Sequence, residues 1–386
     1  MLLKEKYNPM YFLLALGAGG LSVSFYMHLM FLVPHKEVPM ATYDQIFPAL
    51  LKGDWLSFVV SFSLVFIIAF AILHFKLLLW NIKQYRSFKE TEAFTTLKNS
   101  NAEITLMAIP LTFAMTINVF FVLGAVFVPG LWSVVEFLFP GAILGFMVTG
   151  YYGLKIFSDN FIRLITTGDF DFNKNNNLSQ MISIFAFSMI AVGFAAPGAM
   201  SHNLIINAIG IFSAIFFGTI SVLLILIKLT IGFKSIFEQG VANEASPSLW
   251  IMIPILTLLG ITFIRISFGL DHQFDQTLAN SSLFTITSVV VALQLLFGLL
   301  GLKVMKHIGY FEEFVHGDKK SPVSFALICP GVAFAVFGFF FVNMGLTLNG
   351  VVEKYSIAYF LLMAPFVFVQ YKTVEYFFRL KGKFAL

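Results

Sequence analysis

Long apolar runs separated by short polar segments dominate the pattern of this chain. An α-helix rises about 1.5 Å per residue, so roughly 20 apolar residues are needed to cross about 30 Å of hydrocarbon. Ten runs reach that length. We expect spans at Met10–Val33, Trp55–Trp80, Ala102–Val128, Trp132–Phe157, Leu178–Met200, Asn203–Phe233, Ser248–Phe268, Ser282–Met305, Val323–Leu346 and Tyr355–Phe378.

The continuity of these runs indicates helices. Strands of a transmembrane barrel alternate apolar and polar residues over about ten positions, whereas these runs stay apolar for much longer. The first run lacks a small-residue cleavage site, so we expect a spanning helix there and not a removable signal peptide. The pattern therefore predicts an all-α integral membrane protein, with residues 1–386 forming a single transmembrane domain.

Composition excludes a large water-soluble domain. The chain is 59% hydrophobic and only 11% charged, whereas soluble proteins carry about 25% charged residues. The formal net charge of +4 is better explained by orientation in the bilayer than by a nucleic-acid partner. The single cysteine, Cys329, excludes a disulfide framework and a thiolate metal site, so we expect no metal and no cofactor.

Basic residues are distributed unevenly between the two sides of the predicted bundle. They gather at the N-terminus, around residues 76–98, 155–174, 228–234 and 303–320, and at the C-terminal end, whereas the other side has only Lys36, Lys52 and Lys354. Lysine and arginine in short loops stay cytoplasmic. We therefore expect both termini on the cytoplasmic side of the cell (inner) membrane, which requires an even number of spans.

A proline recurs within or at the start of each odd-numbered span. Proline kinks a helix and frees backbone groups, which are tolerated in a membrane where they face protein or a water-filled cavity. We expect five hairpins, with the odd helices forming an inner pore ring and the even helices an outer ring. The pore-kink prolines are Pro9, Pro110, Pro197, Pro254 and Pro330, and the pore-lining hydroxyls are Thr112, Thr116, Ser188, Thr257 and Ser324.

An ordinary structural role is the alternative for both the prolines and the hydroxyls, and the sequence leaves it open. Proline is commoner in transmembrane helices than in soluble ones, and hydroxyl side chains also form ordinary hydrogen bonds between helices. Even spans carry hydroxyls too, which keeps the contrast between the two sets of spans modest.

Several segments carry a resemblance to a known family: Asn8–Phe12 with the glycine-rich Leu16–Gly20, Ile109–Phe113 around Pro110, Ala196–Ser201, and Pro322–Pro330. Over its whole length the chain resembles the tellurite-resistance/dicarboxylate transporters and the slow-type anion channels. The resemblance implies a homotrimer in the lipid bilayer, with a separate pore in each subunit. It also implies passage of small inorganic or carboxylate anions, of the dicarboxylate, sulfite, nitrate or chloride class.

The same resemblance implies a pore that is closed by a phenylalanine on the ninth helix. Phe325 is the first candidate gate and Phe334 the second, because each lies about one turn from Pro330. The family usually has aromatic residues just ahead of this proline, where this chain has Phe325, Leu327 and Cys329. The chain contains 49 phenylalanines, so simple packing is the alternative role for either candidate.

Arg265, near the outer end of the seventh span, is the candidate for an outer vestibule that attracts anions. The loop that follows it carries Asp271 and Asp275. A charge inside a membrane is costly and is usually retained for function. The structural alternatives are snorkelling to the interface and an ion pair with Glu136.

A membrane subunit of a respiratory quinone- or haem-linked enzyme is the alternative from another class. Haem ligation needs histidines on neighbouring helices at one depth of the membrane, and only His28 with His202 meets that condition. Hydrolase and kinase motifs are absent from the sequence. We therefore expect a transport protein and not an enzyme, with a channel and a coupled carrier both open.

Overall fold

The computed structural model describes residues 2–171, 175–274 and 277–386. It is 83% helix, and no strand occurs in these residues. Lys174, which belongs to one of the predicted basic loops, and Asp275, which follows Arg265, lie outside the described residues.

The described ranges contain ten helical segments long and apolar enough to span a membrane, which confirms the predicted number. They are Pro9–Leu32, Trp55–Phe88, Asn101–Phe127, Leu131–Thr167, Ser179–Met200, Leu204–Gln239, Asn243–Gln273, Asn280–His307, Pro322–Thr347 and Ile357–Lys383. Several extend beyond the predicted apolar runs, because polar and basic residues continue the helix past the apolar part. Short helical segments outside the spans are Lys4–Lys6, α2 (Tyr43–Leu51), α4 (Glu92–Lys98) and the π-helical Phe311–His316, and the ninth span ends in a π-helical segment, Phe341–Thr347.

Each odd-numbered span begins with a 3₁₀ segment before its α-helix. These segments are Pro9–Tyr11 before α1 (Phe12–Leu32), Asn101–Met107 before α5 (Ala108–Phe127), Ser179–Met181 before α7 (Ile182–Met200), Asn243–Trp250 before α9 (Met252–Gln273) and Pro322–Leu327 before α11 (Ile328–Phe340). The even-numbered spans are the α-helices α3 (Trp55–Phe88), α6 (Leu131–Thr167), α8 (Leu204–Gln239), α10 (Asn280–His307) and α12 (Ile357–Lys383).

The prolines of the odd spans lie mainly where these two helix types meet. Pro110, Pro254 and Pro330 are each the third residue of their α-helix. The first N–H groups of a helix have no intrahelical partner, so proline removes no helical hydrogen bond there. Pro9 is the first residue of a 3₁₀ turn, and Pro197 lies in the last turn of α7.

Odd and even spans differ in burial. In the most apolar stretch of each span, 61% to 100% of the residues are buried in the odd spans, against 28% to 39% in the even spans. A helix that is apolar on all sides is buried among other helices or in lipid. The exposed apolar side chains of the even helices therefore lie where lipid chains would cover them.

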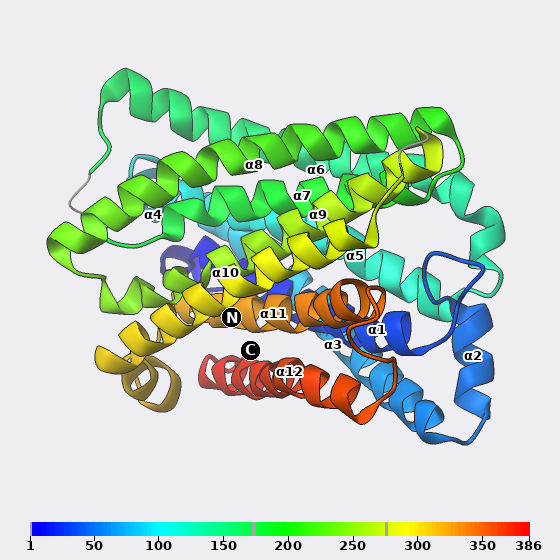
Figure 1. Ribbon diagram of the computed structural model, residues 1–386. Coiled ribbons are helices and arrows are strands. Elements are labelled where there is room, and N and C mark those ends of the chain that lie inside the picture. The colour runs from blue at the N-terminus through cyan, green and yellow to red at the C-terminus, as the bar shows by residue number, and fades with distance from the viewer. Residues whose placement is uncertain (1, 172–174, 275–276) are drawn as a thin grey trace.

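Helix packing follows the chain order in part. Each odd helix packs against the even helix that follows it, as α7 does against α8 and α11 against α12. Odd helices also pack against one another: α1 against α5 and α11, α7 against α5 and α9, and α9 against α11. In Figure 1, α8 and α12 lie on opposite sides of the bundle, with α1, α7 and α11 between them.

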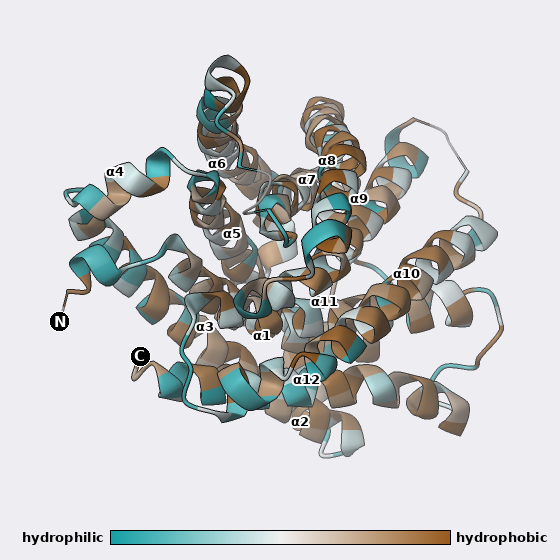
Figure 2. Ribbon diagram, turned by 90° about the vertical axis from the view of Figure 1, so that its left-hand side faces the viewer, coloured by the Kyte–Doolittle hydropathy of each residue, from teal (hydrophilic) through white to brown (hydrophobic). Residues whose placement is uncertain are grey.

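Both termini lie at one end of the bundle, which we call the termini face. The Leu3 amide donates to Gln84 near the end of α3 (2.8 Å), and the ring of Phe384 packs on Tyr11. Figure 2 looks onto this face and shows hydrophilic residues at the near helix ends, with hydrophobic residues along the helices. The other end, where α2 lies between α1 and α3, is the opposite face.

Candidate functional site

A cavity of about 570 Å³ lies inside the bundle. Its wall is formed by α1, α5, α7, α9 and α11, together with Trp132 at the start of α6 and residues of the loops on the opposite face, such as Glu37 and His202. A volume of this size is typical of small-molecule sites. The cavity runs from the opposite face inward to Leu16 and Phe185.

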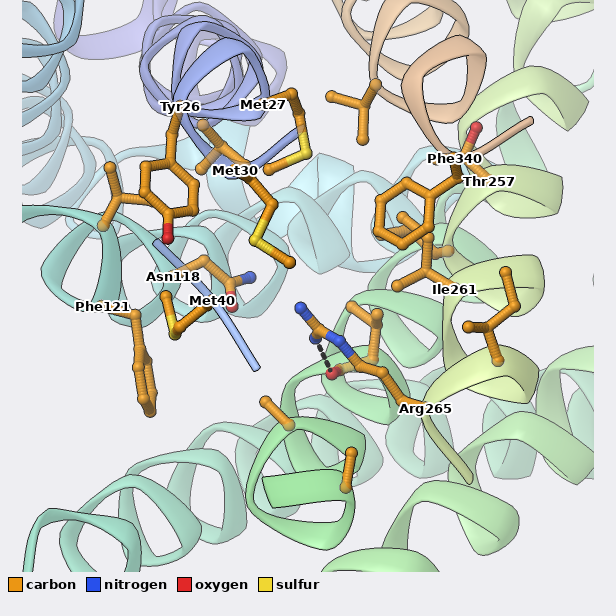
Figure 3. Close-up of a pocket in the computed structure, with 18 of the residues that line it drawn as sticks. Tyr26, Met27, Met30, Met40, Asn118, Phe121, Thr257, Ile261, Arg265 and Phe340 are labelled. Carbon is orange, nitrogen blue, oxygen red and sulfur yellow. Dashed lines mark hydrogen bonds between the residues drawn. The ribbon is translucent and has the colours of Figure 1, made fainter. Parts of the chain in front are cut away.

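Arg265 of α9 is the only Lys or Arg side chain that lines this cavity among the described residues. Its Nη1 donates to the carbonyl oxygen of Val192 on α7 (2.8 Å), and in Figure 3 the guanidinium points into the space between α1 and α9. A guanidinium has five N–H donors. Within the described ranges it makes this one hydrogen bond and no ion pair with a carboxylate.

Glu136, the candidate ion-pair partner of Arg265, is used elsewhere. Its carboxylate accepts hydrogen bonds from the Ser201 hydroxyl (2.7 Å) and the His202 amide (2.6 Å). These bonds tie α6 to the α7–α8 turn. The alternative that Glu136 neutralises Arg265 is therefore not what the structure shows.

The other polar side chains near Arg265 are bonded to protein atoms. The Tyr26 hydroxyl donates to the carbonyl of Ala41 (2.6 Å), and the Asn118 amide contacts the Met189 sulfur (3.4 Å). Thr257 donates to the carbonyl of Ile253 (3.0 Å) and accepts from Gln294 (2.6 Å). The remaining donors of Arg265 are thus free for a ligand in the cavity.

The wall is mostly apolar, and methionine is the most frequent residue type in it. Seven of the 15 methionines of the chain line the cavity: Met27, Met30, Met40, Met115, Met189, Met200 and Met344. The thioether is polarizable and unbranched, so it adapts to the shape of an apolar ligand. Glu37 and Asp271, the two carboxylates of the lining, belong to the loop after α1 and to the last turns of α9 at the opposite face.

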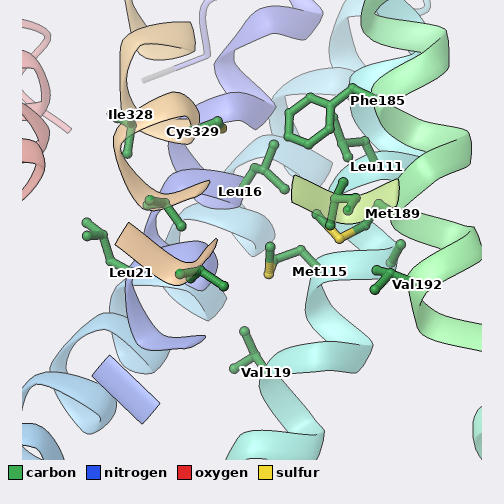
Figure 4. Close-up of a cluster of buried hydrophobic side chains, with 14 of the residues drawn as sticks. Leu16, Leu21, Leu111, Met115, Val119, Phe185, Met189, Val192, Ile328 and Cys329 are labelled. Atoms are coloured by element: carbon green, nitrogen blue, oxygen red, sulfur yellow. The ribbon is translucent and has the colours of Figure 1, made fainter. Parts of the chain in front are cut away.

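A second cavity of about 30 Å³, enough for about one water molecule, lies toward the termini face. It is lined by the first residues of α1, α7, α9 and α11 and by the segments before them. Phe185, Pro254 and Cys329 line both cavities. These three residues therefore form the wall between them, and Figure 4 shows Phe185 and Cys329 beside Leu16.

The two candidate gate residues line neither cavity. Phe325 is fully buried, and its ring centroid lies 4.9 Å from that of Phe384 and 5.8 Å from that of Tyr11. Phe334 packs on Phe366 of α12, with the ring centroids 4.8 Å apart. Both gate assignments stay predictions.

Of the predicted pore-lining hydroxyls, Thr257 lines the large cavity and the other four line neither cavity. Thr112 donates to the carbonyl of Ala108 (2.7 Å), and Thr116 donates to that of Thr112 (2.9 Å). Ser324 accepts from the Tyr310 hydroxyl (2.8 Å), and the buried Ser188 hydroxyl has no partner within the described ranges. Thr112 also donates to the carbonyl of Phe12 on α1 (3.3 Å), and Thr116 hydrogen-bonds His74 of α3 (2.9 Å), so these two hydroxyls lie between packed helices.

The predicted pore-kink prolines separate in the same way. Pro254 lines both cavities, and Pro330 lines the small one. Pro9, Pro110 and Pro197 are buried outside both linings.

The two histidines of the haem alternative have different surroundings. His28 hydrogen-bonds Gln370 of α12 (2.9 Å) and packs against Phe339, whereas the ring of His202 lies 4.9 Å from that of His272. In the part of the chain that the structure describes, no group of three or more His, Cys, Asp or Glu residues is placed to hold a metal ion.

Of the predicted site residues, Arg265, Thr257 and Pro254 line the large cavity, whereas Phe185 and the lining methionines were not predicted from the sequence. An intramembrane charge stands out in an apolar sequence. A phenylalanine or methionine does not, because the same residue types also fill cores and face lipid. Phe185 and Cys329 are distinguished from other buried apolar residues only by the structure, in which each lines both cavities.

Comparison of the chain with models of known protein families gave no match, and comparison with curated proteins gave none either.

Proposed function

We propose that this protein passes small anions across a membrane through the interior of each subunit. The odd helices form an inner ring around the path, and the even helices shield that ring from lipid. The proposal keeps the dicarboxylate, sulfite, nitrate and chloride class of the resemblance as its starting set, and a homotrimer as the assembly.

Two features of the bundle support this arrangement. The pairwise packing of α1, α5, α7, α9 and α11 forms a closed series in which each helix contacts two others of the set. The same five helices supply nearly all of the cavity wall and are the more buried set. A buried ring with a hollow centre is the geometry that a conduit needs.

The choice of an anion as the transported species rests on Arg265, the only Lys or Arg in the described lining of the cavity. A positive charge in a membrane-embedded cavity repels cations and attracts anions, because the surrounding apolar wall screens it weakly. Its guanidinium has unused donors that fit carboxylate, sulfite or nitrate oxygens. Glu37 and Asp271 lie nearer the loops, in reach of water at the opposite face.

The wall between the two cavities is the constriction of this path. Phe185 from α7, Pro254 from α9 and Cys329 from α11 separate a wide cavity open to one face from a water-sized cavity toward the other. Apolar constrictions close pores by excluding water. This arrangement then corresponds to a closed state that is accessible from the opposite face.

Anion flux into proteoliposomes tests the proposal. We expect uptake of one or more of nitrate, chloride, sulfite or succinate by the purified protein. Arg265→Gln should lower that uptake roughly 10- to 100-fold, because a hydrogen bond to a charged group contributes about 1.5–3 kcal/mol. Arg265→Lys, which keeps the charge, is the matched control and should lose much less.

Cation flux gives the decisive contrary result. If a salt gradient produces a cation-selective reversal potential, the anion assignment is wrong. If Arg265→Gln is correctly folded and passes anions at the wild-type rate, the path does not run past Arg265.

A further inference from the structure

The large cavity is strongly asymmetric in polarity. Arg265 is the only cationic Lys or Arg group in its described lining, and it lies toward the opposite face on α9. The inward half is formed by Leu16, Met115, Phe185 and Met189. A ligand that fills the cavity therefore meets one guanidinium at one end and an apolar wall at the other.

A small inorganic anion matches only one part of this site. Chloride or nitrate would use Arg265 and leave most of about 570 Å³ empty or filled with water. Water is poorly held by an apolar wall that offers few hydrogen-bond partners. An anion with an apolar body would instead bury that body against the methionines and gain about 0.8 kcal/mol for each methylene group.

A dianion matches the site poorly. Its second carboxylate would lie in the inward half, where the described lining offers no second cation. Burial of an unpaired charge in an apolar environment is very costly. At the other end, where His202 and His272 also line the cavity, Glu37 and Asp271 would repel a second negative charge that extended toward the loops.

We propose that the cavity is a binding site for amphiphilic monoanions, namely medium-chain or aryl monocarboxylates. Their carboxylate pairs with the free donors of Arg265, and their apolar body lies among Met27, Met115 and Met189. Figure 3 shows Met27 and Met30 across the cavity from Arg265. This inference rests on the proposed function for the transport step, and it replaces the small inorganic anions and dicarboxylates of the starting set with monocarboxylates that have an apolar body.

Equilibrium binding of radiolabelled octanoate to the protein in nanodiscs tests the site. Competition by acetate, butanoate and hexanoate should show affinity that rises about fourfold per methylene group, the ratio equivalent to about 0.8 kcal/mol. Octanol lacks the charge and octanedioate adds a second one, so both should compete at least tenfold more weakly than octanoate.

Two variants separate the charge from the wall. Arg265→Gln should weaken octanoate binding roughly 10- to 100-fold. Nanodiscs that contain this variant have the same lipids, so the label that they retain measures the octanoate dissolved in lipid, which is subtracted from the wild-type signal. Met189→Gln is similar in size and places an amide in the inward half. It should weaken octanoate binding and leave acetate binding unchanged.

The inference is overturned if affinity does not depend on chain length, if octanedioate binds as tightly as octanoate, or if folded Arg265→Gln binds octanoate like the wild type. Its failure differs from failure of the proposed function. Nitrate or chloride flux without octanoate binding leaves transport standing and removes this ligand class. Octanoate binding without flux of any anion does the reverse.

Discussion

At the scale of single residues, Phe185 and Phe325 show how the same side chain takes different roles. Both are buried, with Phe185 5% exposed and Phe325 0% exposed. Phe325 is enclosed by Tyr11 and Phe384 at the termini face. Phe185 has a cavity on each side, so removal of its ring would join the two spaces. We therefore place the proposed constriction on α7 as much as on α11.

We expect Phe185→Ala to raise anion flux roughly tenfold, because an apolar constriction that is widened admits water and ions. Phe325→Ala is the matched control and should lower stability by about 3–5 kcal/mol, the usual cost of a deleted core phenylalanine, without raising flux. Proteoliposome flux and thermal unfolding of both variants supply the measurements. Higher flux in Phe325→Ala than in Phe185→Ala would instead support the predicted gate at Phe325 on the ninth span.

At the scale of elements, α7 is the most enclosed helix, with its most apolar stretch wholly buried. Glycines allow the C-terminal end of α7, at Gly198, to approach the backbones of α8 and α9 closely. A Cβ on Gly210 of α8 would lie 2.7 Å from the Gly198 nitrogen, and one on Gly269 of α9 would lie closer still to the Gly198 carbonyl oxygen. Small residues allow such close backbone approach between membrane helices. The Asn207 amide donates to the same Gly198 oxygen (2.5 Å).

Gly210→Ala should destabilise the protein by about 1–3 kcal/mol, because the new methyl group overlaps backbone atoms that cannot move independently. Gly218 lies on the same helix, and a Cβ added there would have nothing within 4 Å, so Gly218→Ala is the control. It should be neutral or slightly stabilising, since alanine favours a helix by about 1 kcal/mol over glycine. Thermal unfolding in detergent compares the two. Equal thermal unfolding midpoints for the two variants would show that moving α8 away from α7 costs no stability.

At the scale of the whole molecule, ten spans place both termini at one face. That face also receives the loops rich in lysine and arginine. The opposite face has only Lys36, Lys52 and Lys354 among the described basic residues outside the spans. Charge asymmetry sets the orientation of a membrane protein during insertion. Because the basic loops all lie at the termini face, a single orientation places all of them on the same side of the membrane.

We expect the termini face to be cytoplasmic. A fluorescent protein fused after Leu386 should fluoresce in cells. Alkaline phosphatase folds only outside the cytoplasm, so the enzyme inserted at Gly350, in the turn before α12, should be active. The two reporters check each other. Active phosphatase at Leu386 would reverse the orientation and place the mouth of the large cavity in the cytoplasm.

The assembly is a separate expectation. Native mass spectrometry in mild detergent should give a species of three times the 43.2 kDa chain mass. The exposed apolar side chains on α6, α8 and α10 allow contact with lipid or with another subunit. A mass of one or two chains would contradict the homotrimer and leave the cavity of each subunit unaffected.

The sequence by itself determined that the chain is all-helical with ten spans, because continuous apolar length is a one-dimensional property. It also singled out Arg265, because a charge in an apolar run is conspicuous. Tertiary structure alone decided which side chains face the cavity. Thr257 and Thr112 look alike in sequence, yet Thr257 lines the cavity, whereas Thr112 lies outside it and its hydroxyl bonds to Ala108 of its own helix and to Phe12 of α1. The physical reason is that helices apolar on all sides, such as α7, carry no polar stripe to fix their rotation. Their rotation is set by packing against neighbours distant in the sequence.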